Sequence, residues 1–177
     1  MDAFKEIGFI GLGQIGNPVA KRLVNAGYRV RVYDVRDEAL AALAAAGAER
    51  MSSAADVAAA CDVVLVSLPT PQIVEQVACG EKGILEKPRC RIYIDLSTTG
   101  PGVAERVAQT LAARGIATVD APVSGGVGGA VAGTLSIMTA CSAELFEQVK
   151  PLLSTIVRCV EQWAKVEVGG KGAASAE

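Results

Sequence analysis

Residues 7–16 have the sequence Ile7-Gly8-Phe9-Ile10-Gly11-Leu12-Gly13-Gln14-Ile15-Gly16, an apolar run that leads into a glycine-rich turn. The three glycines of the pattern Gly11-x-Gly13-x-x-Gly16 suit a strand–turn–helix junction. They allow a tight turn, close approach of backbone N–H groups to a pyrophosphate, and close packing of the helix on the strand. Asp34 ends the next apolar run, 23 positions after Gly11. The stretch therefore predicts a βαβ unit that holds a dinucleotide, whereas a glycine turn without a ligand is the alternative.

The same alternation of short apolar runs with alanine-rich segments continues along the chain. It is typical of an α/β fold with a doubly wound, mostly parallel sheet and helices on both faces. Strands are expected at Glu6–Ile10, Arg29–Tyr33, Val63–Ser67, Ile92–Asp95, Ala117–Asp120 and Leu135–Ala140. Helices are expected at Ile15–Ala26, Glu38–Ala46, Ala54–Ala60, Pro101–Gly115 and Ala143–Thr155. Their expected boundary signals are Gly27, Gly47 and Gly115 at C-termini, and Ser52 or Ser53 and Pro101 at N-termini.

Composition narrows the class of partner. Hydrophobic residues make up 51% of the 177 residues, yet no apolar stretch approaches the roughly 18 residues of a membrane span. No basic segment precedes a long apolar one, which argues against a secretory signal. The net charge is −2 and the lysines and arginines are scattered, which argues against a nucleic-acid or anionic-membrane surface. We therefore expect a cytoplasmic protein with a small-molecule partner.

Histidine and cysteine usage excludes several kinds of site. The chain contains no histidine, which removes a Ser-His-Asp triad and His-ligated zinc. Its five cysteines are odd in number, widely spaced and without a CxxC pair. They are expected to be reduced thiols and not metal ligands.

Asp34 bears on the choice of dinucleotide. Its carboxylate suits the ribose hydroxyls of NAD, whereas a 2′-phosphate a few Å away would be repelled by about 4 kcal/mol per charge pair at an effective dielectric of about 20. Arg36 follows two residues later and offers a cation to such a phosphate, although a solvated loop cation is the more common role. NAD is the expected cofactor, and NADP stays open.

Two further loops follow expected strands, where ligands sit in open α/β sheets. They are Ser67-Leu68-Pro69-Thr70-Pro71 and Asp95-Leu96-Ser97-Thr98-Thr99. Contact with adenosine or nicotinamide is one interpretation of both. A rigid proline turn and an ordinary helix cap are equally good alternatives.

Residues 120–135, DAPVSGGVGGAVAGTL, combine an acid, a proline, a serine and five glycines directly after an apolar run. Such a run packs poorly, but its backbone N–H groups and serine hydroxyl suit an anion. With the earlier segments, it makes the chain resemble the β-hydroxyacid dehydrogenase family, which includes 3-hydroxyisobutyrate dehydrogenases, tartronate semialdehyde reductases and 6-phosphogluconate dehydrogenases. The motifs that carry the resemblance are Gly8 to Pro18, Leu68-Pro69, Ser97-Thr98 and Asp120 to Gly126, and Ile15 stands where methionine is more common.

The resemblance implies a Rossmann-type fold and a set of binding residues. The implied cofactor contacts are Gly11, Leu12, Gly13, Gln14, Ile15, Gly16, Asp34, Val35, Leu68, Pro69 and Thr98. Ser124, Gly125 and Gly126 are implied to hold a substrate carboxylate beside the nicotinamide. The implied reaction is hydride transfer between the nicotinamide and a short 3-hydroxy acid.

The resemblance also implies an acid/base lysine, in a pattern like G-x-x-G-x-[GA]-x-x-x-K. Gly169, Gly172 and Ala174 follow this pattern, which places the lysine directly after Glu177, while Lys165 and Lys171 stand at other positions. No catalytic residue is therefore assigned, and little or no turnover is expected of residues 1–177 alone. We expect a dinucleotide-binding domain at residues 1–163 and, at residues 164–177, the start of a connection to a helical domain through which the parent enzyme forms a homo-oligomer.

Two other functions fit the same residues. One is the corresponding domain of an NADPH-dependent semialdehyde reductase or imine reductase that uses Arg36. The other is a dinucleotide-binding module without catalysis.

Overall fold

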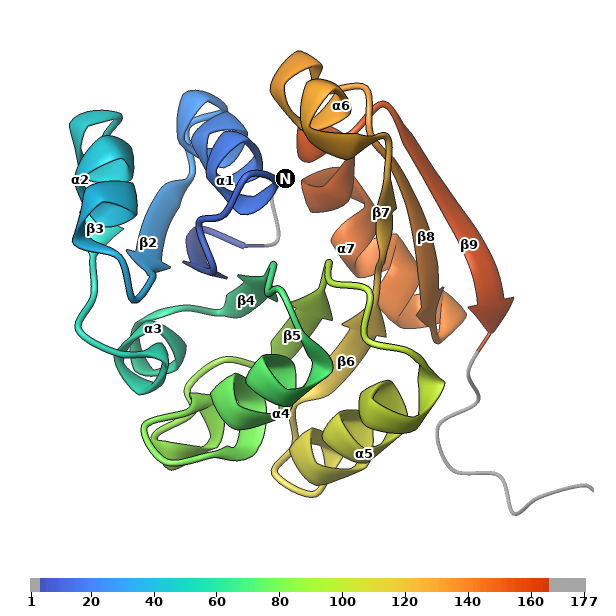
Figure 1. The fold of residues 1–177 in the computed structure, drawn as a ribbon. Helices are drawn as coiled ribbons and strands as arrows, with labels where there is room; N and C mark the ends of the chain where they lie inside the picture. Colours follow the sequence, from blue (N-terminus) through green and yellow to red (C-terminus); the bar gives the residue numbers. More distant parts are fainter. Residues whose placement is uncertain (1–3, 166–177) are drawn as a thin grey trace, which may run out of the picture.

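A parallel sheet forms the centre of the computed structural model, which describes residues 4–165 (Figure 1). Its strands within this range are β1 (Glu6–Ile10), β2 (Arg29–Tyr33), β3 (Glu49–Arg50), β4 (Val63–Val66), β5 (Ile92–Asp95), β6 (Ala117–Asp120), β7 (Val123–Ser124), β8 (Ser136–Cys141) and β9 (Cys159–Lys165). They lie in the order β3-β2-β1-β4-β5-β6-β8-β7, and β9 pairs with β8. The first six follow the strand order of the doubly wound dinucleotide-binding fold.

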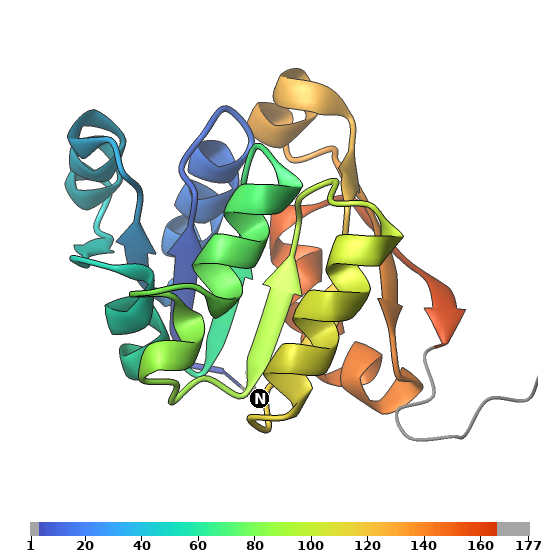
Figure 2. The same ribbon diagram turned by 60° about the horizontal axis from the view of Figure 1, so that its bottom comes forward.

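Helices cover both faces of this sheet (Figures 1 and 2). One face is covered by α1 (Gly16–Asn25), α2 (Asp37–Ala45) and α7 (Ala143–Ile156), and the other by α3 (Ala54–Ala60), α4 (Pro71–Cys79) and α5 (Pro101–Ala112). A short 3-10 turn, η1 (Ile84–Glu86), follows α4, and α6 (Gly126–Ala132) packs beside α1. Side chains alternate between the two cores along β1, since Ile7 and Phe9 enter one and Ile10 enters the other. The predicted α/β class is confirmed.

The local boundary signals act as predicted. Gly27, Gly47 and Gly115 have positive φ angles of 90°, 107° and 74° after α1, α2 and α5. Ser53 is the N-cap of α3, where its hydroxyl accepts a hydrogen bond from the Asp56 N–H at 3.0 Å. Pro101 opens the first turn of α5.

Several elements differ from the prediction. The strand expected at Val63–Ser67 ends at Val66, and the one expected at Leu135–Ala140 is shifted by one residue. That strand, β8, runs antiparallel to β6, so the parallel order stops there. Strands β3, β7 and β9, helices α4 and α6, and the turn η1 were not predicted. Strand β9 passes residue 163, the predicted end of the domain, and residues 166–177 of the predicted connection lie outside the described residues.

No helix within residues 4–165 has the length and apolar character to cross a membrane. The same residues contain no cluster of three or more cysteine or acidic side chains that would hold a metal ion. The five cysteines are free thiols.

Candidate dinucleotide-binding site

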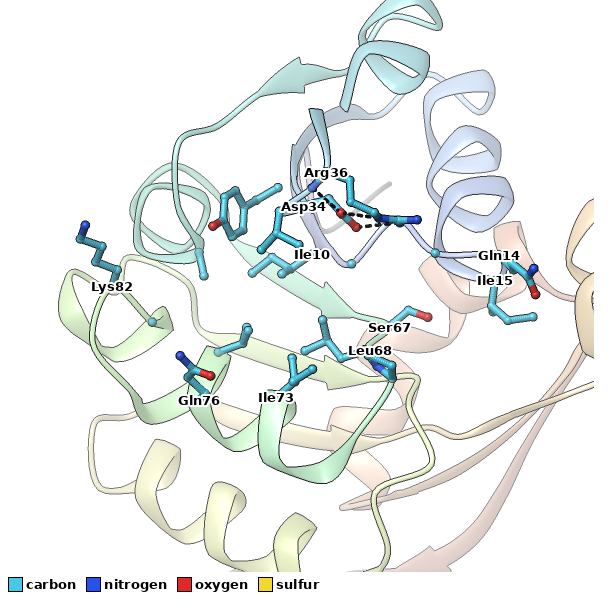
Figure 3. Close-up of a pocket in the computed structure, with 18 of the residues that line it drawn as sticks. Ile10, Gln14, Ile15, Asp34, Arg36, Ser67, Leu68, Ile73, Gln76 and Lys82 are labelled. Carbon is cyan, nitrogen blue, oxygen red and sulfur yellow. Dashed lines mark hydrogen bonds and ion pairs between the residues drawn. The ribbon is translucent and has the colours of Figure 1, made fainter. Parts of the chain in front are cut away.

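A cleft of about 820 Å³ lies at the carboxyl ends of β1 and β4, where the chain connections turn to opposite faces of the sheet (Figure 3). Ligands of open α/β sheets bind at this switch point. The cleft is lined by Ile10, Gly11, Gly13, Gln14, Ile15, Tyr33, Asp34, Val35, Arg36, Ala54, Ser67, Leu68, Pro69, Ile73, Gln76, Val77, Glu81, Lys82 and Gly83. Figure 3 shows Ile73 and Gln76 of α4 across the cleft from Ile10.

The three glycines of the turn have different surroundings. Gly11 has a φ of 90°, and a Cβ there would collide with the carbonyl oxygen of Ser67. A Cβ at Gly16 would collide with the carbonyl oxygen of Gly11, so this glycine lets α1 pack closely on the turn. A Cβ at Gly13 would meet nothing within 4 Å. The turn is thus closed on its inner side and open at Gly13, the side from which a phosphate would approach.

Asp34 joins the end of β2 to this turn. Its Oδ2 accepts a hydrogen bond from the Leu12 N–H at 2.6 Å, and its Oδ1 accepts one from the Arg36 N–H at 2.9 Å. The Arg36 guanidinium donates from Nε to Asp34 Oδ1 at 3.0 Å and from Nη2 to the Leu12 carbonyl at 2.9 Å. The glycine turn, the carboxylate and the arginine therefore form one connected network. The dashed lines in Figure 3 mark its Asp34–Arg36 contacts.

Asp34 is held in its ionised form at this end of the cleft. Burial raises the pKa of Asp34, but the hydrogen bonds from the Arg36 side chain and from the Leu12 and Arg36 backbones outweigh it and lower the pKa below its usual value. The Asp34 side chain is 8% exposed, whereas that of Arg36 is 57% exposed. Asp34 is thus a fixed acceptor, and Arg36 is a partly exposed cation hydrogen-bonded to it and to the Leu12 carbonyl.

A second network lies behind the loop after β4. The Leu68 N–H donates to the Ser97 hydroxyl at 2.9 Å, and the Ser97 N–H donates to Oδ1 of Asp95 at 2.8 Å. The Thr99 hydroxyl donates to Oδ2 of Asp95 at 3.3 Å. Burial raises the pKa of Asp95, and these hydrogen bonds offset part of that rise. The loops after β4 and β5 are therefore connected to each other.

Asp120 ends β6 directly beside Asp95, because the two are paired residues of neighbouring strands. Burial, and next the charge of Asp95, raise the pKa of Asp120 to about 6. Two carboxylates at this spacing disfavour each other's ionised form. The pair lies at the base of the loop that contains Ser124.

The structure places the predicted residues in three groups. The cleft is lined by Gly11, Gly13, Gln14, Ile15, Asp34, Val35, Leu68 and Pro69. Leu12 and Gly16 are buried within the turn, where Leu12 adds its side chain to the core. Thr98, Ser124, Gly125 and Gly126 are exposed and lie outside this cleft, after β5 and β6 at the same edge of the sheet. Their roles in binding stay predictions.

Sequence reasoning missed the wall of the cleft that α4 provides. This helix begins after Thr70, whose hydroxyl accepts a hydrogen bond from the Ile73 N–H at 3.3 Å, with Pro71 in its first turn. A capping residue followed by proline is a helix-start signal, so the sequence contained the information. Ile73, Gln76 and Val77 of this helix face the cleft.

The strand order and the glycine turn define a Rossmann-type dinucleotide-binding domain. A family model of the NAD-binding domain of 6-phosphogluconate dehydrogenase matches residues 6–164, and the chain belongs to this family. It is 42% identical to a 3-hydroxyisobutyrate dehydrogenase of Pseudomonas aeruginosa over 86% of this chain and 52% of that protein. It is 40% identical to a 2-(hydroxymethyl)glutarate dehydrogenase of Eubacterium barkeri over 99% of this chain and 57% of that protein. The chain thus spans about half the length of these curated relatives.

Solved structures agree with this assignment. The 3-hydroxyisobutyrate dehydrogenase of Mycobacterium tuberculosis with L-serine has a TM-score of 0.85 at 33% identity, covering 90% of this chain and 54% of that one. An imine reductase variant of Myxococcus stipitatus in complex with NAD⁺ has a TM-score of 0.84 at 18% identity, covering 91% and 55%, and shares the fold. The predicted family, fold and NAD-binding character are therefore confirmed.

Proposed function

We propose that the cleft binds NAD with its adenosine ribose on Asp34 and its pyrophosphate over Gly13, and that the chain is the cofactor-binding part of a hydroxyacid dehydrogenase. The observation that carries this proposal is the Asp34 carboxylate, which is tied to the Leu12 N–H at 2.6 Å and so is fixed beside the open face of the glycine turn. A carboxylate there accepts hydrogen bonds from ribose hydroxyls, and the N-terminus of α1 favours phosphate.

The reaction that fits is oxidation of a short 3-hydroxy acid or reduction of its 3-oxo or semialdehyde form. Bound NAD supplies the acceptor for the hydride that leaves the carbon bearing the hydroxyl group. The Ser124 hydroxyl and the N–H groups of Gly125 and Gly126 are proposed to hold the substrate carboxylate. Gly125 and Gly126 have positive φ angles of 128° and 64°, a backbone conformation that exposes successive amides to an anion.

Residues 1–177 are proposed to bind cofactor but to turn over slowly or not at all. The hydroxyl proton needs an acid/base group, the chain has no histidine, and Lys165 and Lys171 do not stand at the position that the family resemblance implies for the lysine. Loss of a positioned acid/base group lowers the rate about 10²- to 10⁴-fold. A kcat within the usual range of roughly 1–10³ s⁻¹ would contradict this part of the proposal.

Cofactor choice is tested by titrating the protein with NADH and with NADPH and following the cofactor fluorescence. We expect NADH to bind at least about tenfold more tightly, because a 2′-phosphate would face the Asp34 carboxylate. Asp34→Asn keeps an oxygen for the Leu12 N–H but removes the charge. It should therefore strengthen NADPH binding and so reduce the difference between the NADH and NADPH affinities. Asp37→Asn is the matched control, since Asp37 is a neighbouring acid that does not line the cleft.

A second candidate is an NADPH-dependent reductase of the same fold. The observation that favours it is the partly exposed Arg36 guanidinium, which lies 3.0 Å from Asp34 and offers a cation to a 2′-phosphate beside that carboxylate. In that case wild type binds NADPH at least as tightly as NADH, and Arg36→Ala removes the NADPH binding selectively. Equal affinity for NADH and NADPH would also contradict the first proposal, which expects tighter binding of NADH.

A further inference from the structure

Asp95 is a buried carboxylate that does not line the cleft. It ends β5 and is 5% exposed. An acid in such a position is costly, because burial disfavours its charge, and the neighbouring Asp120 adds a second carboxylate. The groups that donate hydrogen bonds to this carboxylate therefore indicate its role.

Its hydrogen bonds all lead to the loops at the edge of the sheet. Asp95 accepts from the Ser97 N–H at 2.8 Å and from the Thr99 hydroxyl at 3.3 Å. Ser97 is itself 7% exposed. Two short polar side chains are thereby ordered in a buried environment, where hydrogen bonds are directional and hard to replace with water.

Ser97 connects Asp95 to a residue that lines the cleft. Its hydroxyl oxygen accepts the Leu68 N–H at 2.9 Å, and Leu68 lines the cleft. Asp95 thus holds the Ser97 backbone, while the Ser97 hydroxyl oxygen uses a lone pair to hold the Leu68 amide. The Asp95 carbonyl also accepts the Ala121 N–H at 2.8 Å, at the start of the segment that leads to Ser124.

We propose that Asp95 is a positioning residue of the cofactor site, which acts through Ser97 to fix the Leu68-Pro69 loop against the bound dinucleotide. This inference rests on the proposed function for its effect on cofactor affinity. Its structural part, the fixing of the Leu68 amide by Ser97, does not depend on any ligand.

The test compares four variants of the full chain: Ser97→Ala, Ser97→Thr, Asp95→Asn and Asp120→Asn. Ser97→Ala removes the acceptor of the Leu68 N–H, and Ser97→Thr restores a hydroxyl. Asp95→Asn removes the charge and replaces one of the two acceptor oxygens, which bind the Ser97 N–H and the Thr99 hydroxyl, with an NH₂ donor. Asp120→Asn is the matched control, because this neighbouring carboxylate ends the next strand and has no hydrogen bond to the Leu68 loop. The readouts are NADH affinity, the exchange rate of the Leu68 amide without cofactor, and the urea unfolding midpoint.

We expect Ser97→Ala and Asp95→Asn to weaken NADH binding about five- to tenfold, in line with the loss of one net hydrogen bond. The hydrogen-exchange rate of the Leu68 amide should rise at least about tenfold in both variants. In Ser97→Thr and Asp120→Asn, this rate and the NADH affinity should stay within about twofold of wild type. The inference is wrong if the Leu68 amide exchange rate and the NADH affinity are unchanged in Ser97→Ala. It is also wrong if Asp120→Asn weakens NADH binding as much as Asp95→Asn does. Should Asp95→Asn fail to fold, the two Ser97 variants still decide. Should wild type not bind NADH, the proposed function fails, and the exchange of Leu68 still tests the positioning.

Discussion

Replacement of Asp120 by asparagine should stabilise the protein at neutral pH. Asp120 has a folded-state pKa of about 6, raised by burial and by the charge of Asp95. Tyr93 of β5 also faces this pair, and its pKa is raised well above its usual value, so it stays neutral. The ionised Asp120 carboxylate is therefore less stable in the folded protein than in the unfolded chain, and asparagine removes this penalty.

The size and pH range of the effect follow from the pKa. The folded state binds the Asp120 proton more tightly than the unfolded chain, whose pKa is near 3.8, so the free energy of unfolding falls between about pH 4 and pH 6. A rise of about two pKa units corresponds to about 3 kcal/mol, and partial exposure of Asp120 reduces this to about 1–3 kcal/mol. The gain from Asp120→Asn should thus be near zero at pH 4, grow to pH 6 and stay constant above it.

Urea unfolding of wild type and Asp120→Asn at steps from pH 4 to pH 8 measures this difference. Acids away from this pair titrate alike in both proteins, so their contributions cancel, whereas the relief of Asp95 is part of the measured difference. Glu147→Gln is the control, because this exposed acid of α7 should give a difference that is small at every pH. A difference that does not change with pH, or an Asp120→Asn protein that is less stable than wild type at pH 7, would refute the reasoning.

The glycine turn and a helix cap give two further predictions. Gly16→Ala should lower the free energy of unfolding by about 3 kcal/mol or more in urea titrations, because its Cβ would collide with the Gly11 carbonyl oxygen. Gly13→Ala should change stability by less than about 1 kcal/mol but weaken NADH binding at least about tenfold, since its methyl group would occupy the open side of the turn; a stable variant with normal affinity would contradict the phosphate position. Ser53→Ala should lower stability by about 1 kcal/mol through loss of the α3 cap, with NADH affinity unchanged.

The sequence predicted those parts of the fold that depend on local signals. Gly27 and Gly47 end helices because a left-handed residue is needed there, and this requirement is readable in the sequence alone. The β4 run, Val63–Val66, is buried on both sides, as a continuous β-branched stretch in a parallel sheet should be. Asp34 and the glycine turn were each predicted to bind the cofactor, and they meet in the structure because carboxyl ends of neighbouring parallel strands share one edge.

Elements that depend on distant contacts were not predicted. Helix α6 contains three glycines and has weak intrinsic helix propensity, and it is held by packing of Gly129 and Ala130 against the core around Leu135. Strand β9 exists because it pairs with β8 along most of its length. The connection of Asp95 through Ser97 to Leu68 spans 27 positions between its ends and follows from the adjacency of β4 and β5. A single sequence contains no signal for such pairings.

The order of the strands explains why residues far apart in the chain lie along one edge of the sheet. Asp34, Gly11, Leu68, Asp95 and Asp120 follow or end β2, β1, β4, β5 and β6, which are consecutive neighbours in the sheet. Four steps of about 4.8 Å place Asp34 and Asp120 roughly 19 Å apart along this edge. In the proposed binding mode, a dinucleotide with its ribose on Asp34 extends across β1 and β4 toward β5 and β6, with its reactive end toward the segment that contains Ser124. In this binding mode, the loop after β5 needs support from the buried side of the sheet edge. Asp95, at the end of β5, is a buried group that accepts hydrogen bonds from Ser97 and Thr99 of this loop.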